Sequence, residues 1–252
     1  MPACFSLKTG EILMALYEIA GLIIDIDFKY DYCINYCADF IYKGSREADF
    51  SVSVSEAEIE KMKAKDELKL PNGMYESLCA YKQICDKAFE YDCMFMHCSA
   101  LSYCGNAVLF TAPSGTGKST HSRLWREYFG DKVEMINDDK PLLRRIDGKF
   151  FVCGTPWNGK HHLGSKKMAP VKSIVILSQA QENSIKKASP GEAIFTVLNQ
   201  TIRPYDENKM DKLMELVNGL LGGTPVYKMG CNISENAVTT AFSAVKENFD
   251  ED

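Results

Sequence analysis

The stretch of sequence that decides the fold is Ala112-Pro113-Ser114-Gly115-Thr116-Gly117-Lys118-Ser119-Thr120. Apart from Ala112, which stands where the pattern has its first glycine, this is a Walker A motif, the P-loop that binds nucleotide phosphates. Its glycines let backbone N–H groups turn around an anion, and a helix that follows points its positive end at the same place. Lys118 is spaced to reach the β- and γ-phosphates, and the Ser119 hydroxyl to hold Mg²⁺. We therefore expect these residues to bind ATP, rather than to form a glycine-rich structural turn.

The segments on either side have the patterns of a strand and a helix. Asn106–Thr111 is a short apolar run that leads into the motif. Ser119–Phe129 is followed by Gly130, and glycine favours the position just after a helix. A strand before the motif and a helix after it are the context that a P-loop requires.

Two adjacent carboxylates, Asp138 and Asp139, follow the next apolar run, Val133–Ile136. In α/β folds, ligands bind at the edge of the sheet where such strands end. Adjacent side chains alternate sides, so one carboxylate can face a metal ion and the other an acceptor hydroxyl. Two aspartates alone would be interpreted as a solvated turn, but a P-loop upstream favours the functional interpretation.

His97 lies in the apolar stretch Met94–Leu101, which we expect to be a strand, 15 residues before Ala112. A histidine in such a place is ordinarily part of the core. Here the neighbouring strand leads into the P-loop, so the His97 side chain can approach the two carboxylates.

A basic segment follows the aspartates. Between Gly148 and Gln181 there is no acidic residue, while the same stretch carries five lysines and two histidines: Lys149, Lys160, His161, His162, Lys166, Lys167 and Lys172. A solvated loop is one interpretation. We slightly favour a loop that closes over phosphate or an anionic acceptor, because it directly follows the predicted catalytic elements.

The remaining pattern predicts a mixed sheet. Leu142–Ile146 and Lys149–Cys153 flank Asp147-Gly148, a two-residue hairpin turn, and Ser173–Leu177 is a continuous apolar run typical of a central strand. Further elements are expected as a helix opened by Ser189, a helix over Asp206–Leu221, a strand over Pro225–Met229 and a helix over Ser234–Glu247. The hairpin excludes a simple βαβ alternation, and the fold class is α/β.

The first part of the chain has a different character. Leu16–Phe28 is a strand-like run, Phe50–Val54 alternates with period two, and Ser55 with Glu58 forms a capping box that opens a helix. The turn signal Lys69–Gly73 precedes a helical stripe over Met74–Glu90. We therefore predict a small β-rich N-terminal region over residues 1–73 and a P-loop domain over residues 74–252.

Composition bounds the function. The 252 residues are 46% hydrophobic and 25% charged, which excludes a disordered chain, a collagen-like fibre and a disulfide mini-protein. A net charge of −5 argues against a nucleic-acid partner. No apolar run reaches the roughly 18 residues of a membrane span, and the N-terminus lacks a leader pattern, so we expect a cytoplasmic protein without a membrane partner. The ten cysteines are expected to be mostly buried thiols.

The order of His97, the P-loop and the Asp138-Asp139 pair resembles the catalytic half of HPr kinase/phosphorylase. It resembles more closely the shorter HPr-kinase-like proteins found beside peptide-modification genes, and phosphoenolpyruvate carboxykinases share the same kind of core. The resemblance covers residues 94–247 and extends to three further stretches: Gly154-Thr155-Pro156-Trp157-Asn158-Gly159-Lys160, Ala169-Pro170-Val171-Lys172 and Pro225-Val226-Tyr227-Lys228-Met229-Gly230-Cys231.

The resemblance implies a mixed-sheet P-loop kinase core and ATP-dependent phosphorylation of a serine hydroxyl on a protein or peptide. It implies that Lys118 and Ser119 hold ATP and Mg²⁺, that Asp138 is the catalytic base supported by His97, and that Asp139 is its partner on the metal side. The two aspartates can also have the opposite roles. The sequence leaves open whether the chain forms a homo-oligomer.

Departures from the family's pattern narrow the range of possible acceptors. The Arg-Gly-Leu-Gly signature of HPr kinase is replaced by Gly154-Thr155-Pro156-Trp157, which argues against HPr as the acceptor and against the reverse phosphorylase reaction. The alternatives are a nucleotide-binding regulatory module with little or no catalysis, and a small-molecule kinase. Arg203, just before a proline, is a second candidate for the active face, against the alternative of a surface arginine.

Overall fold

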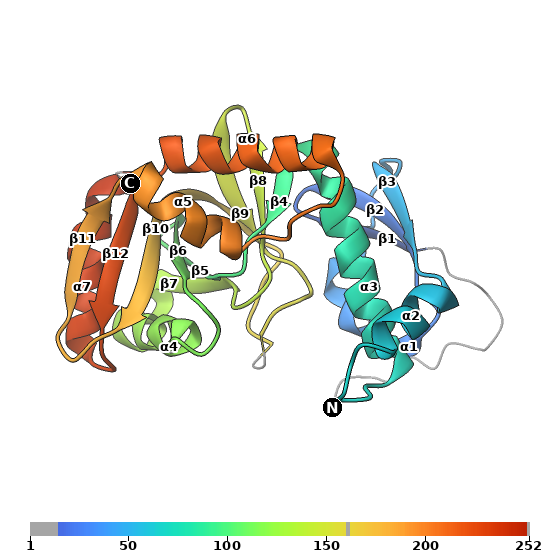
Figure 1. Cartoon of the computed structure of the whole chain (residues 1–252), viewed down its shortest axis with the longest axis horizontal. Helices are drawn as coiled ribbons and strands as arrows, with labels where there is room; N and C mark the ends of the chain where they lie inside the picture. Colours follow the sequence, from blue (N-terminus) through green and yellow to red (C-terminus); the bar gives the residue numbers. More distant parts are fainter. Residues whose placement is uncertain (1–14, 160–161, 251–252) are drawn as a thin grey trace. The chain divides into compact units, whose positions relative to one another are not determined.

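The computed structural model describes residues 15–159 and 162–250 of the chain (Figure 1). The chain forms two compact units, which divide between Tyr81 and Lys82. In the described part of the chain, no helix combines the length and the apolar character that crossing a membrane requires.

The first unit contains a small three-stranded sheet in the order β1 (Ala15–Ile19), β2 (Leu22–Asp27), β3 (Phe50–Ser53). β1 and β2 are antiparallel, and β3 runs parallel to β2. The single strand-like run predicted from Leu16 is therefore two strands of a hairpin. Ala20 and Gly21 both have positive φ, 56° and 71°, and they form its turn. An alanine is rare in that conformation, so the sequence carried little sign of the turn.

Helices complete the first unit. They are α1 (Asp31–Tyr36), which the sequence did not predict, α2 (Glu56–Lys63) and the beginning of α3 (Asn72–Lys87). The predicted capping box at the start of α2 is confirmed, with reciprocal hydrogen bonds between Ser55 and Glu58. The predicted domain boundary at Gly73 falls in the first turn of α3, and the domain assignment stays a prediction.

The second unit is built on a larger mixed sheet, as predicted. Its main path runs β4-β8-β9-β10-β6-β5-β7, with β12 beside β10 and β11 beside β12. The strands are β4 (Cys93–Phe95), β5 (Ser99–Tyr103), β6 (Asn106–Thr111), β7 (Val133–Asn137), β8 (Leu142–Ile146), β9 (Lys149–Cys153), β10 (Met168–Gln179), β11 (Ser184–Ala188) and β12 (Val226–Cys231). β11 was not predicted, and β10 extends the predicted run at both ends.

The directions of three neighbouring strands place the predicted site residues together. β5 is antiparallel both to β6 and to β7, so β6 and β7 run the same way. The ends of β6 and β7 and the start of β5 therefore lie at one edge of the sheet. This edge collects the loop after β6, the segment before β5 and the turn after β7.

Helices pack on both faces of this sheet. Along β6, Ala107 and Leu109 belong to a core shared with α5 (Pro190–Asn199) and α6 (Glu207–Gly223). Val108 and Phe110 belong to a core shared with α4 (Lys118–Phe129) and α7 (Glu235–Val245). This alternation buries β6 on both sides and makes it a rigid support for the loop that follows it.

Most other details of the second unit follow the sequence. The hairpin at Asp147-Gly148 is confirmed, with φ of 49° and 76°. The helix predicted over Asp206–Leu221 runs two residues further, because Gly222 and Gly223 both lie inside α6, which ends before Thr224. Seven of the nine described cysteines are buried, as expected, and Cys104 is exposed.

Candidate functional site

The loop between β6 and α4 has the conformation that its glycines permit. Gly115 and Gly117 have φ of 80° and 117°, and nothing lies within 4 Å of the position that a Cβ would take at either residue. Ala112 is fully buried and is not among the residues with positive φ, so its methyl group is tolerated where the motif has glycine. Only Gly115 and Gly117 need glycine here, and the departure at Ala112 costs no backbone strain.

Lys118 is a nearly buried cation at the first position of α4. Its side chain is 7% exposed, and its Nζ donates a hydrogen bond to the Ala112 carbonyl oxygen at 2.9 Å. Burial lowers the pKa of Lys118, and the nearby carboxylates of Asp139 and Asp138 oppose that shift. A buried ammonium with one carbonyl partner among the described residues favours an incoming anion.

Asp138 is 5% exposed and is positioned by β5. The Ser99 hydroxyl donates to its Oδ1 at 2.6 Å. Among the described residues, Oδ2 accepts no hydrogen bond, and a Cβ added at Gly159 would stand 3.2 Å from it. Asp138 therefore has one oxygen that is held and one that is free to accept.

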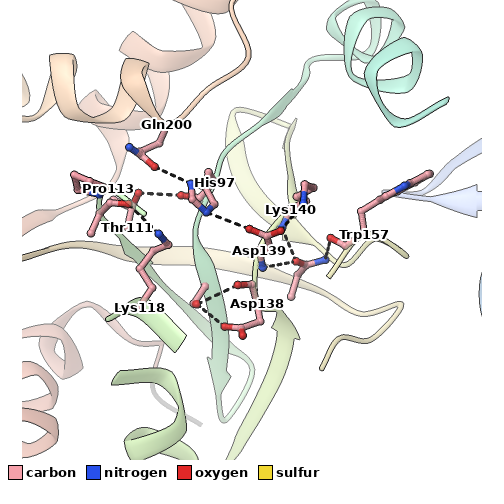
Figure 2. A network of polar contacts seen from close by, with 12 residues as sticks. His97, Thr111, Pro113, Lys118, Asp138, Asp139, Lys140, Trp157 and Gln200 are labelled. Carbon is pink, nitrogen blue, oxygen red and sulfur yellow. Dashed lines mark hydrogen bonds and ion pairs between the residues drawn. The ribbon is translucent and has the colours of Figure 1, made fainter. Parts of the chain in front are cut away.

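Asp139 is held by two cationic or proton-donating partners (Figure 2). His97 Nε2 lies 3.1 Å from its Oδ1, and Lys140 Nζ pairs with its Oδ2. Burial alone would raise the pKa of Asp139, but the hydrogen bonds from His97 and Lys140 outweigh it and lower the pKa to about 2. The Asp139 carboxylate is therefore ionised at neutral pH and acts by its charge.

His97 joins this site to α5. The sequence predicted His97 within a strand. It lies instead in the short connection between β4 and β5, because the strand pairing is interrupted over Met96–Cys98. Its Nδ1 is 3.0 Å from Gln200 Oε1, and its carbonyl oxygen accepts from the Thr111 hydroxyl at 3.1 Å (Figure 2). These contacts fix both the ring and the backbone beside the end of β6.

Asn137 shapes the turn that carries both aspartates. Its Oδ1 accepts from the backbone N–H groups of Asp139 and Lys140, at 2.9 and 2.8 Å. Its Nδ2 donates to the carbonyl oxygens of Thr155 and Trp157. The Gly154–Trp157 stretch thus supports the turn that carries the two aspartates.

The predicted residues meet at one cavity of about 480 Å³. Except for Thr116, all the residues predicted to be catalytic or to bind nucleotide or metal line it: His97, Ser114, Gly115, Gly117, Lys118, Ser119, Thr120, Asp138 and Asp139. The Thr116 hydroxyl instead closes the loop by donating to the Pro113 carbonyl oxygen at 2.9 Å. Gly159 also lines the cavity and was not predicted.

The closure of the basic segment over an anion stays a prediction. Lys160 and His161 lie outside the described residues. Lys167 is exposed and pairs with Glu134 on β7, so part of the segment's charge is already offset. Arg203 is exposed and bonds Asn199 at the end of α5, which places it outside the set of residues lining the cavity.

Three contributors were missed by sequence reasoning: Ser99, Lys140 and Gln200. Ser99 lies two residues after His97, and residues two apart in an extended chain share a side, so that spacing was a usable signal. Lys140 directly follows the aspartates. Gln200 is more than 100 residues from His97 and carries no motif, so only the tertiary structure reveals it.

Comparisons with known proteins find distant structural neighbours and no family. No family model matches the chain, and no curated protein is similar to it. Forty-nine chains of solved structures are similar. One of them is the HPr(Ser) kinase/phosphatase from Coxiella burnetii, with a TM-score of 0.37 and 11% sequence identity, over 61% of this chain and 88% of that chain. So loose a likeness shows neither a shared family nor a shared activity, and the resemblance to HPr kinase stays a prediction.

Proposed function

We propose that the second unit is an ATP-dependent phosphotransferase that phosphorylates a serine hydroxyl of a protein or peptide. One observation carries the proposal: a buried lysine at a helix start, a glycine loop, and two carboxylates with a histidine line a single cavity. Phosphoryl transfer needs little more than a charge clamp, a metal ligand and a base. Each of these has a candidate among the lining residues.

In the proposed mechanism, ATP is held by Lys118 and by the N–H groups of the loop that precedes α4. The β- and γ-phosphates would offset the charge of the Lys118 ammonium, which donates to the Ala112 carbonyl oxygen. Ser119 and Asp139 offer the oxygen ligands that Mg²⁺ prefers, and both line the cavity. Magnesium, when bound, offsets the negative charge of the phosphates.

Asp138 is the proposed base and Asp139 its electrostatic partner. The free Oδ2 of Asp138 takes the proton of the acceptor hydroxyl while the hydroxyl oxygen forms a bond to the γ-phosphorus. The bond from the γ-phosphorus to the β-phosphate oxygen breaks, and ADP leaves. Asp139, with its lowered pKa, stays ionised throughout and keeps His97 oriented. The hydrogen bond that holds Oδ1 of Asp138 and the pairing of Asp139 with His97 and Lys140 support this division of roles.

The test is phosphate transfer by the full chain from Mg-ATP to a pool of synthetic serine peptides, measured by mass spectrometry. Removing a general base costs about 10²–10⁴-fold in rate. Asp138→Asn should therefore lose transfer and keep nucleotide binding. Asp147→Asn, in the β8–β9 turn, is the matched control and should behave as wild type. Equal transfer by wild type and Asp138→Asn would contradict the assignment, and nucleotide binding without transfer by wild type would favour a regulatory module.

A further inference from the structure

A second cavity, of about 250 Å³, adjoins the central one. The two share three lining residues, Ser119, Thr120 and Asp138. The rest of its wall comes from Arg123 and Arg126 of α4, with Met135 and Leu163 as apolar sides. We call this cavity the arginine pocket.

The two arginines give the pocket its charge. Arg123 and Arg126 are three residues apart on α4 and so lie on one face of the helix. Arg123 Nη1 pairs with Glu127 at 2.6 Å. Arg126 Nε is buried and has no hydrogen-bond partner among the described residues. A buried donor left unpaired is costly, and the residue that carries this one also lines the pocket.

The position of Asp138 indicates which ligand. A hydroxyl that gives its proton to Asp138 lies where the two cavities meet, because Asp138 lines both. In the proposed function the phosphates occupy the central cavity. The acceptor atoms next to this hydroxyl then lie in the arginine pocket, on the other side of Asp138.

We propose that the arginine pocket binds an anionic group of the acceptor, namely a carboxylate close to the serine that is phosphorylated. This inference rests on the proposed function and adds the substrate class to it. Guanidinium groups match carboxylates with paired, charge-assisted hydrogen bonds. A volume of about 250 Å³ accepts an acidic side chain or a terminal carboxylate and excludes a longer segment.

The experiment compares two serine peptide pools that are identical except for the flanking positions, which hold Asp and Glu in one pool and Asn and Gln in the other. Wild type should phosphorylate the acidic pool with at least about tenfold higher kcat/KM, as charge-assisted hydrogen bonds allow. Arg126→Met should abolish this preference, mainly through KM, with Mg-ATP affinity and thermal stability unchanged. Arg46→Met, an exposed arginine of the first unit, is the matched control.

The outcomes separate this inference from the proposed function. An equal preference in wild type and Arg126→Met would overturn the inference, and so would a loss of Mg-ATP affinity in Arg126→Met, because the pocket would then serve the nucleotide. Transfer to neither pool by wild type would contradict the proposed function itself. Free L-serine carries the same carboxylate, and faster transfer to L-serine than to the acidic pool would identify a small hydroxy acid as the source of the group.

Discussion

His97 Nε2 lies 3.1 Å from Asp139 Oδ1, and this contact ties the segment before β5 to the turn after β7. The pKa of Asp139 is lowered to about 2, so its carboxylate is ionised and can only accept. The hydrogen atom in the contact therefore belongs to His97. A carboxylate so strongly held is a poor proton acceptor at neutral pH, which favours Asp138 as the base.

The first prediction concerns acid stability. The folded-state pKa of Asp139 is below its ordinary value of 3.8, so its contribution to the free energy of unfolding is present above about pH 4 and is lost as pH falls towards 2. Asp139→Asn should cost on the order of 2 kcal/mol at pH 7, and the difference from wild type should shrink between pH 4 and pH 2.

Tryptophan fluorescence during urea unfolding measures this difference. Both tryptophans, Trp125 and Trp157, are buried in the second unit, so the signal reports the unit that holds Asp139. A constant difference across the whole pH range would contradict the lowered pKa. Asp147→Asn serves again as the control, since its side chain lies in an exposed turn.

The second prediction concerns His121, which lies in the first turn of α4. Its Nε2 accepts from Trp125 Nε1 at 3.1 Å, and its Nδ1 is buried without a partner among the described residues. Burial lowers the pKa of His121 to about 4. The unfolded chain binds this proton near pH 6.5 and the folded chain does not, so stability falls as pH drops from 6.5 to 4.

His121→Gln should remove this pH dependence, which amounts to about 2–3 kcal/mol across that range. The measurement is the same urea unfolding at pH 7 and pH 5. Parallel pH profiles for wild type and His121→Gln would show that His121 titrates normally.

The third prediction isolates the support of the proposed base. Ser99→Ala removes the 2.6 Å hydrogen bond to Asp138 Oδ1 and lets the carboxylate turn away from the cavity. Transfer to serine peptides should slow by about tenfold, the value of one hydrogen bond to a charged group, at unchanged Mg-ATP affinity. Ser102→Ala, on the same strand, is the control. A Ser99→Ala variant that transfers at the wild-type rate would show that Asp138 needs no support from β5.

The core of the site could be predicted from sequence because its signals are local. The loop from Ser114 to Thr120 is a continuous motif, and Asp138-Asp139 directly follows a strand-like run. The strand directions around β5 then bring both to one sheet edge. That step depends on hydrogen-bond pairing between distant segments, which composition and periodicity do not encode.

The other predictions from sequence differ from the structure for identifiable physical reasons. The turn at Ala20-Gly21 contains an alanine with positive φ, so the sequence pattern predicted one strand where the structure has a hairpin. Gly222-Gly223 stayed helical because the neighbouring Leu220 and Leu221 are buried, and packing outweighs the low helix propensity of glycine. Gln200 gains its role only from its contact with His97, and Arg126 only from the cavity that it lines.

The most direct test of the central claim is calorimetric binding of a non-hydrolysable Mg-ATP analogue to three folded proteins. The structure predicts that wild type and Asp138→Asn bind with similar affinity. Lys118→Met should bind at least about tenfold more weakly, because it lacks the ammonium that offsets the phosphates. Its thermal stability should not fall, since the substitution removes a charge that burial disfavours. Unchanged affinity in folded Lys118→Met, or no binding by wild type, would contradict the nucleotide site.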